Sequence, residues 1–237
     1  MLESIAGKTA VITGGTRGIG RAIAERLLIE GARVAICGRT RENVERTVAE
    51  MSSRFPGRVT GETADVARFP DVEKFFRAVD AQFGGLDILV NNAGVGVFAP
   101  TAELTPEAWH RAIDTNLNGA FYCSREALAR FRNGAGGYII NISSLAGKNP
   151  FAGGAAYNAS KFGLNGFSEA MMLDHRYENV RVSYILPGSV DTEFGREGGG
   201  DWKIAPADVA EVVAMLLRMP VRTLVSRVEI RPSKPRK

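Results

Sequence analysis

Thr13-Gly14-Gly15-Thr16-Arg17-Gly18-Ile19-Gly20 is a glycine-rich turn that follows an apolar, β-branched run and opens a helical pattern. Glycines let the backbone approach a diphosphate closely, and a helix N-terminus offers free N–H groups and the positive end of its dipole. A strand before and a helix after are the context that such a turn requires, although the spacing G-x-x-x-G-x-G differs from the usual G-x-G-x-x-G. We therefore expect the phosphates of a dinucleotide here, held by Gly14, Thr16, Arg17, Gly18, Ile19 and Gly20.

Short β-branched runs alternate with helical patterns along the rest of the chain, which is typical of βαβ units and a parallel sheet. The predicted strands are Thr9–Thr13, Arg33–Cys37, Arg58–Thr63, Leu86–Asn91, Tyr138–Ile142, Arg181–Leu186 and Leu224–Ile230. Apolar stripes at helical spacing comprise Val72, Phe75, Phe76, Val79 and Phe83, and then Trp109, Ile113, Leu117, Phe121 and Leu128 in a helix starting at Thr105-Pro106. With 237 residues, 45% of them hydrophobic, the chain suits one α/β domain over residues 1–237.

Composition narrows the classes of function and compartment. No apolar run reaches the ~18 residues of a membrane span, and Met1-Leu2-Glu3-Ser4 lacks a signal-peptide layout. Cys37 and Cys123 fit no metal spacing and are interpreted as reduced packing residues of a cytoplasmic protein. The net charge of +4 permits an anionic ligand. The basic segment 231–237 has no interleaved aromatic residue, so nucleic acid is not expected as a partner. A metal ion is not expected either.

Tyr157 and Lys161 form the candidate chemical pair. Residues four apart on a helix share a face, so the phenol and the ammonium point the same way. A cation near a phenol favours the phenolate and lowers the pKa of the tyrosine. Tyr157 is therefore a candidate proton donor and acceptor.

The end of the second predicted strand decides between two nicotinamide cofactors. An NAD-type site carries an acidic residue there, which binds the ribose 2′-hydroxyl. This chain has Gly38 and then Arg39, so no carboxylate repels a 2′-phosphate, and Arg39 and Arg17 are candidates to clamp one. We predict NADPH over NADH, with two ordinary surface arginines as the alternative interpretation.

These motifs together resemble the short-chain dehydrogenase/reductase (SDR) family over essentially the whole chain. The matching motifs are T-G-G-T-R-G-I-G at 13–20, Asp65-Val66, Asn91-Asn92-Ala93-Gly94, Asn116, Ser143-Ser144, Tyr157 with Lys161, and Pro187-Gly188 leading to Thr192. The resemblance implies a Rossmann fold: a doubly wound seven-stranded sheet in the order 3-2-1-4-5-6-7 with helices on both faces. Residues 192–205 would form a lid over the substrate, and 231–237 a basic tail.

The resemblance also implies roles along the cofactor. Asp65 and Val66 would contact the adenine, and Asn91, Ala93 and Gly94 would line the adenosine-ribose side. The nicotinamide would lie against Pro187, Gly188, Val190 and Thr192. Three alternatives remain: Asp65 as a turn residue, Thr192 as a cap and Asn91 as a stabiliser of its strand end.

The family's catalytic tetrad would comprise Asn116, Ser144, Tyr157 and Lys161. Tyr157 would protonate the substrate oxygen, Ser144 would stabilise charge on that oxygen, and Lys161 would hold the ribose hydroxyls. Ser144 is preferred to Ser143 because it stands thirteen positions before Tyr157, the family spacing. Asn116 would distort its helix and bind a water linking Lys161 to solvent, or else be purely structural.

The expected activity is NADPH-dependent reduction of a ketone to a secondary alcohol. The nearest resemblance is to 3-oxoacyl-acyl-carrier-protein reductases, but Ala135 and Glu178 occupy positions where members that dock the carrier tend to have arginine. Sugars, cyclic ketones or diketones are alternative substrates, and a silent NADP-binding sensor or a nucleic-acid module are alternative functions. The expected pocket walls include Phe98, Phe151, Phe194 and Trp202. A homotetramer is implied, with Phe121, Phe167 and Met171 on the spare apolar faces.

Overall fold

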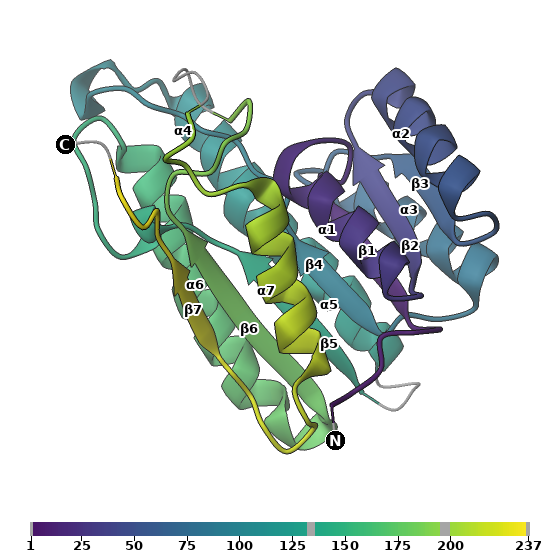
Figure 1. The fold of residues 1–237 in the computed structure, drawn as a ribbon. Coiled ribbons are helices and arrows are strands. Elements are labelled where there is room, and N and C mark those ends of the chain that lie inside the picture. Colours follow the sequence, from purple (N-terminus) through teal and green to yellow (C-terminus); the bar gives the residue numbers. More distant parts are fainter. Residues whose placement is uncertain (1, 132–135, 195–199, 236–237) are drawn as a thin grey trace.

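The structure, a computed structural model, describes residues 2–131, 136–194 and 200–235. These residues contain one seven-stranded sheet in the order β3-β2-β1-β4-β5-β6-β7, with every neighbouring pair parallel (Figure 1). The strands are β1 (Thr9–Thr13), β2 (Arg33–Gly38), β3 (Val59–Thr63), β4 (Ile88–Asn91), β5 (Gly137–Ile142), β6 (Val180–Pro187) and β7 (Arg227–Ile230). The predicted fold and strand order are confirmed, and the predicted strand ends differ from the observed ones by at most three residues.

Helices cover both faces of the sheet. The α-helices are α1 (Gly18–Ile29), α2 (Arg41–Arg54), α3 (Phe69–Phe83), α4 (Pro106–Ile113), α5 (Gly119–Phe131), α6 (Ala155–His175) and α7 (Pro206–Arg218). The shorter helical turns are η1 (Thr101–Glu103), η2 (Asp114–Asn118), η3 (Leu145–Gly147) and η4 (Arg176–Glu178). In β1, Ala10 and Ile12 pack with α1 and α7 in one core, whereas Val11 packs with α3 and α5 in the other. All five positions of β1 are buried, which explains why the strand is apolar between the two threonines at its ends.

The helix predicted to run from Thr105 through Leu128 is interrupted. Thr105 caps α4 as predicted, because its Oγ1 accepts a hydrogen bond from the N–H of Ala108 at 3.2 Å. A π-helical turn, η2, then separates α4 from α5, and Asn116 lies inside that turn. The predicted distortion at Asn116 is therefore present, because its side chain bonds outside the helix.

The outer faces of α5 and α6 partly match the expected subunit-contact surface. Phe121 is 46% exposed and its ring centroid lies 6.1 Å from that of Phe167. Met171 was expected on the spare face, but it is only 3% exposed and packs in the core with α3 and α5. Met171 lines one groove with Phe121 and Phe167, as expected, but its burial means that it leaves little apolar surface uncovered.

The segment after β6 leaves the sheet, and its two ends meet again between Val190 and Ile204, a contact that we call the pinch. Val190 and Ile204 form an isolated parallel bridge, and the N–H of Asp191 donates to the carbonyl of Ile204 at 2.8 Å. The N–H of Ile204 donates back to the carbonyl of Ser189 at 3.0 Å. Of the predicted lid 192–205, residues 195–199 lie outside the described part of the chain. The two ends of this segment are thus tied together just beyond the sheet.

Candidate active site

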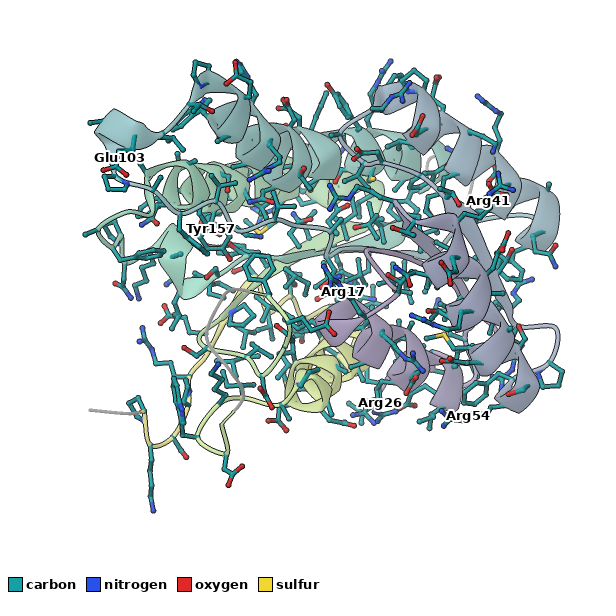
Figure 2. The ribbon with its side chains drawn as sticks, turned by 90° about the horizontal axis from the view of Figure 1, so that it is seen from above. Arg17, Arg26, Arg41, Arg54, Glu103 and Tyr157 are labelled. Atoms are coloured by element: carbon teal, nitrogen blue, oxygen red, sulfur yellow. The ribbon has the colours of Figure 1, made fainter. Side chains whose placement is uncertain are left out.

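A cleft of ≈730 Å³ opens at the carboxyl ends of the strands, where the strand order reverses between β1 and β4. Ligands of open α/β sheets bind at such a switch point. Figure 2 looks down on this end of the molecule and shows Arg17 and Tyr157 there. The cleft is lined by these predicted site residues: Gly14, Thr16, Arg17, Gly18, Ile19, Arg39, Asp65, Val66, Ala93, Gly94, Tyr157, Lys161 and Thr192. The other predicted residues do not line it: Gly20, Asn91, Asn116, Ser144, Pro187, Gly188 and Val190.

The glycine-rich turn keeps its backbone open toward the cleft. Gly14 and Gly18 have φ values of 64° and 54°, a conformation that favours glycine. A Cβ at Gly20 would lie 2.4 Å from the carbonyl oxygen of Gly14, so the turn is closed tightly against the first turn of α1. No side chain caps the N-terminus of α1, which leaves its N–H groups available to an anion. These features fit the diphosphate of a dinucleotide.

Asn92, which we did not predict, holds this turn from the end of β4. Its Nδ2 donates to the carbonyls of Thr13 and Gly14 at 3.0 and 3.1 Å. Asn91 points the other way, and its Nδ2 donates to Oδ1 of Asn141 at 2.8 Å inside the core. Successive strand residues face opposite sides of a sheet, so the alternation at Asn91-Asn92 is the signal that could have told them apart. The structure therefore gives Asn91 the strand-end role that was the alternative interpretation.

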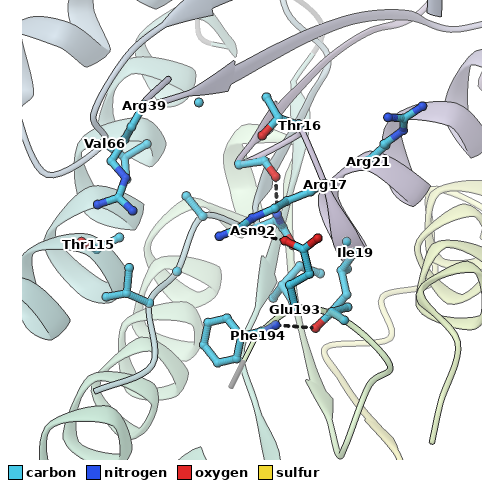
Figure 3. A pocket seen from close by; sticks show the side chains of 18 of the residues that line it. Thr16, Arg17, Ile19, Arg21, Arg39, Val66, Asn92, Thr115, Glu193 and Phe194 are labelled. Atoms are coloured by element: carbon cyan, nitrogen blue, oxygen red, sulfur yellow. Dashed lines mark hydrogen bonds and ion pairs between the residues drawn. The ribbon is translucent and has the colours of Figure 1, made fainter. Parts of the chain in front are cut away.

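The far end of the cleft has the features predicted for a 2′-phosphate site. Gly38 ends β2, and a Cβ there would lie 2.9 Å from Cγ2 of Thr16, so contact with the turn disfavours any larger residue. Arg39 follows and lines the cleft. Arg17 is already engaged, because its Nη1 lies 2.7 Å from Oε2 of Glu193 (Figure 3). Glu193 is a cleft residue that sequence reasoning missed.

Asp65 and Val66 line the cleft after β3. One oxygen of Asp65, Oδ1, accepts a hydrogen bond from the N–H of Ala67 at 3.1 Å, which is the turn role of the alternative interpretation. Asp65 nonetheless lines the cleft, so the turn role and the predicted contact with adenine are compatible.

Thr192 lines the end of the cleft predicted for the nicotinamide, and its Oγ1 accepts from the N–H of Phe194, which Figure 3 labels, at 3.2 Å. The N–H of Gly188 donates to the carbonyl of Ile230 at 2.8 Å, which anchors this loop to β7.

Tyr157, near the start of α6, is the titratable group at the centre of the site. Burial raises the pKa of its phenol, and a hydrogen bond from Ser144 offsets part of that shift. Ser143 is committed elsewhere, since its Oγ donates to Oδ1 of Asn165 at 2.5 Å. The structure therefore brings Ser144, rather than Ser143, to the phenol.

Lys161 does not acidify Tyr157 in this structure, contrary to our prediction. Its Nζ lies 5.9 Å from the centroid of the Tyr157 ring and donates to the carbonyl of Ile142 at 2.9 Å. Burial lowers the pKa of Lys161 to about 8. Desolvation dominates at both side chains, so the phenol is held protonated at neutral pH, which suits a proton donor.

Asn116 lies beside this pair and connects three segments. Its Oδ1 accepts from the N–H of Val95 at 2.8 Å, and its Nδ2 donates to the carbonyl of Val95 and to Oγ of Ser160, both at 3.0 Å. A Cβ on Gly94 would lie 3.3 Å from Oδ1 of Asn116 and 3.9 Å from Nζ of Lys161. Asn116 thus ties the loop after β4 to α6 and approaches the lysine across a glycine.

The remaining sequence-based expectations concern metals, membranes and cysteines. Within residues 2–131, 136–194 and 200–235, no group of three or more His, Cys, Asp or Glu side chains is arranged to hold a metal ion. No helix in that part of the chain has the length and apolarity needed to cross a bilayer. Cys37 and Cys123 are free and buried, and burial raises the pKa of both thiols.

Comparison with known proteins agrees with this geometry. The family model described as short chain dehydrogenase matches residues 8–200. A 3beta-hydroxysteroid dehydrogenase of Mediterraneibacter gnavus is 36% identical over 204 residues, covering 86% of this chain and 73% of that protein. A metagenomic short-chain oxidoreductase solved in complex with NADP is 38% identical with a TM-score of 0.86, covering 98% of this chain and all of that one.

An alcohol dehydrogenase of Thermococcus sibiricus, solved with 5-hydroxy-NADP, is 29% identical with a TM-score of 0.90, covering 97% of this chain and 98% of that one. The sequence matches the short chain dehydrogenase model over most of its length. The same chain has the sheet order, the glycine-rich turn beside the cleft and the Tyr157–Lys161 pair. The protein belongs to the short-chain dehydrogenase/reductase family of oxidoreductases.

Proposed function

We propose that this protein is an NADPH-dependent reductase that converts a ketone into a secondary alcohol. The observation that carries the proposal is a single cleft with residues suited to the cofactor at one end and residues suited to the reaction at the other. One end has Gly38 and Arg39 in place of an acidic residue, and the other has Tyr157 and Lys161. Arginine favours a 2′-phosphate, and a protonated phenol suits reduction of a carbonyl.

In the proposed mechanism, the glycine-rich turn, Arg39 and Lys161 would hold NADPH, which would supply the hydride that the carbonyl carbon accepts. Tyr157 donates its proton to the carbonyl oxygen as the π bond breaks, so a C–H and an O–H bond form. Ser144 donates a hydrogen bond to the same oxygen and stabilises its growing charge. Lys161 holds the ribose hydroxyls, and a water beside Asn116 returns a proton from solvent.

The raised pKa of Tyr157 supports the reductive direction. A phenol that stays protonated at neutral pH is ready to donate, whereas oxidation of an alcohol needs the phenolate first. Lys161, with a pKa of about 8, remains mostly ammonium at neutral pH and can hold the ribose hydroxyls as a hydrogen-bond donor.

The substrate is proposed to be an uncharged small ketone, with 3-oxoacyl thioesters as a candidate to be tested. The expected carrier-docking positions give that candidate little support. Glu178 is acidic and pairs with Nδ1 of His175 at 3.1 Å, and Ala135 lies outside the described residues. We further propose a cytoplasmic homotetramer formed through α5 and α6, where Phe121 and Phe167 leave apolar surface uncovered. Light scattering that finds only monomer would contradict the assembly.

The decisive experiment measures oxidation of NADPH and of NADH with 3-oxoacyl thioesters, diketones and cyclic ketones. We expect a higher kcat/KM with NADPH, and no turnover by Tyr157→Phe although the cofactor still binds. Tyr177→Phe is a matched control, because that ring is 93% exposed on η4, outside the cleft. Equal kcat/KM for both cofactors would refute the NADPH preference. Tight NADP binding without turnover of any ketone would instead favour the sensor.

A further inference from the structure

Three phenylalanines, Phe98, Phe151 and Phe194, form an aromatic collar around the catalytic phenol. They come from the loops after β4, β5 and β6, which all end at the cleft edge of the sheet. The ring centroid of Tyr157 lies 5.5 Å from that of Phe98 and 5.8 Å from that of Phe194. The centroid of Phe151 lies 5.9 Å from that of Phe98. Trp202, expected in the same wall, makes no ring contact with the collar within the described residues.

The collar faces outward and is only half covered. Phe98, Phe151 and Phe194 are 50%, 47% and 45% exposed, whereas Tyr157 is 8% exposed. Large apolar side chains grouped at a reactive centre mark the part of the site that a ligand covers. The collar therefore shields the phenol and offers its own free ring surfaces to the substrate.

Two glycines make room for these rings. A Cβ at Gly96 would lie 2.8 Å from Cε2 of Phe98 and 3.4 Å from Cε1 of Phe194. A Cβ at Gly154 would lie 2.6 Å from Cε2 of Phe151. The rings therefore approach the backbone at Gly96 and Gly154 more closely than any residue with a Cβ would allow.

The charges on the segment leading to Phe151 are already paired. Nζ of Lys148 donates to Oε1 of Glu229 at 2.6 Å. The other oxygen of Glu229 accepts from Nη2 of Arg231 at 3.1 Å. This side of the collar therefore offers a substrate apolar ring surface rather than a free charge.

Resting on the proposed function, we infer that the collar selects a flat aromatic group joined directly to the substrate carbonyl. The rings around Tyr157 meet at interplanar angles of 69° and 48°, the tilted and edge-to-face arrangements that aromatic pairs prefer. An aryl ring bonded to the carbonyl carbon lies beside the phenol while the oxygen reaches Tyr157 and Ser144. A saturated ring of the same size fills the space without the aromatic contacts.

The test compares phenyl methyl ketone with cyclohexyl methyl ketone, which share a carbon skeleton and a carbonyl. We expect kcat/KM with NADPH to favour the phenyl ketone by about 2- to 12-fold. Phe98→Leu and Phe194→Leu keep an apolar side chain and should lower that ratio by about 2- to 12-fold. Phe55→Leu, at the C-terminal end of α2, is the control and should leave the ratio unchanged.

A cyclohexyl ketone reduced as well as the phenyl ketone would overturn the collar assignment and leave the proposed function standing. If neither ketone is reduced, saturation-transfer NMR on the NADP⁺ complex decides. Saturation of the phenyl protons that is lost in Phe98→Leu but kept in Phe55→Leu would support the collar and count against the reductase. No transfer in the wild-type complex would overturn the collar assignment.

Discussion

Glu193→Gln should tighten the binding of NADPH. In the structure Glu193 pairs with Arg17, one of the two arginines expected to hold the 2′-phosphate. Arg17 must leave the carboxylate before it can bind a phosphate, so the ion pair competes with the cofactor. Removing the negative charge removes that competition while preserving the shape of the side chain.

The structure sets the size of this effect. The side chains of Arg17 and Glu193 are 72% and 79% exposed, so water and salt screen their attraction strongly. Exposed ion pairs contribute roughly 0.2–1 kcal/mol, which corresponds to about 1.4- to 5-fold in an affinity. We expect the Kd for NADPH to fall by a factor in that range, and the Kd for NADH to change less.

Titration of NADPH fluorescence at low and high salt measures the effect, which should shrink at high salt. Asp191→Asn removes a charge two residues away without touching Arg17, and so controls for general repulsion of a polyanion. In an Arg17→Gln background, Glu193→Gln should have no effect. Tightening that persists there, or equal tightening by Asp191→Asn, would refute the competition.

Three other substitutions test the site and its scaffold. Lys161→Met should abolish activity. It should also stabilise the apoprotein at pH 7 by at most about 3 kcal/mol. The pKa of Lys161 is lowered from 10.5 to about 8, which means that folding disfavours its ammonium form. Since the wild type gains that stability between pH 8 and 10.5, urea unfolding should show the difference shrinking as pH rises, and a constant difference would contradict the burial argument. Gly20→Ala should weaken NADPH binding at least ~10-fold, because the new Cβ would meet Asn92 and the Gly14 carbonyl. Gly85→Ala is the control and should not weaken binding, because a Cβ there meets nothing within 4 Å. Equal affinities of the two variants in calorimetric titrations would refute the close approach at Gly20. Thr105→Ala should cost about 1 kcal/mol in chemical unfolding by removing the α4 cap, and Thr105→Ser should restore most of it.

The fold could be predicted from the sequence because its signals are local and agree with one another. Apolar β-branched runs marked the strands, and the turn at 13–20 marked where the first strand passes into a helix. Thr105 and Pro106 marked the start of α4 through a hydrogen bond that spans three residues. Each of these signals depends on neighbours in the chain, so tertiary contacts did not overturn them.

The parts that could not be predicted depend on residues far apart in sequence. Glu193 pairs with Arg17, which lies 176 positions away in the sequence, and no local pattern predicts that pair. Lys161 and Tyr157 share a helix face, but burial dominates the pKa shift of each, with the Ser144 hydrogen bond opposing it at Tyr157. Met171 shares the groove between α5 and α6 with Phe121 and Phe167, but helical spacing could not show that neighbouring side chains would bury it.

The pinch between Val190 and Ile204 separates the sheet from the segment that runs between these two residues. Because the two ends of the intervening segment are bonded to each other, the sheet and α7 hold their positions whatever sequence runs between them. The segment carries Thr192, Glu193 and Phe194, which line the cleft, so its replacement would alter contacts to the dinucleotide and to the substrate together. The bonded ends confine such a change to the cleft, so binding specificity can vary while the sheet beneath it stays the same.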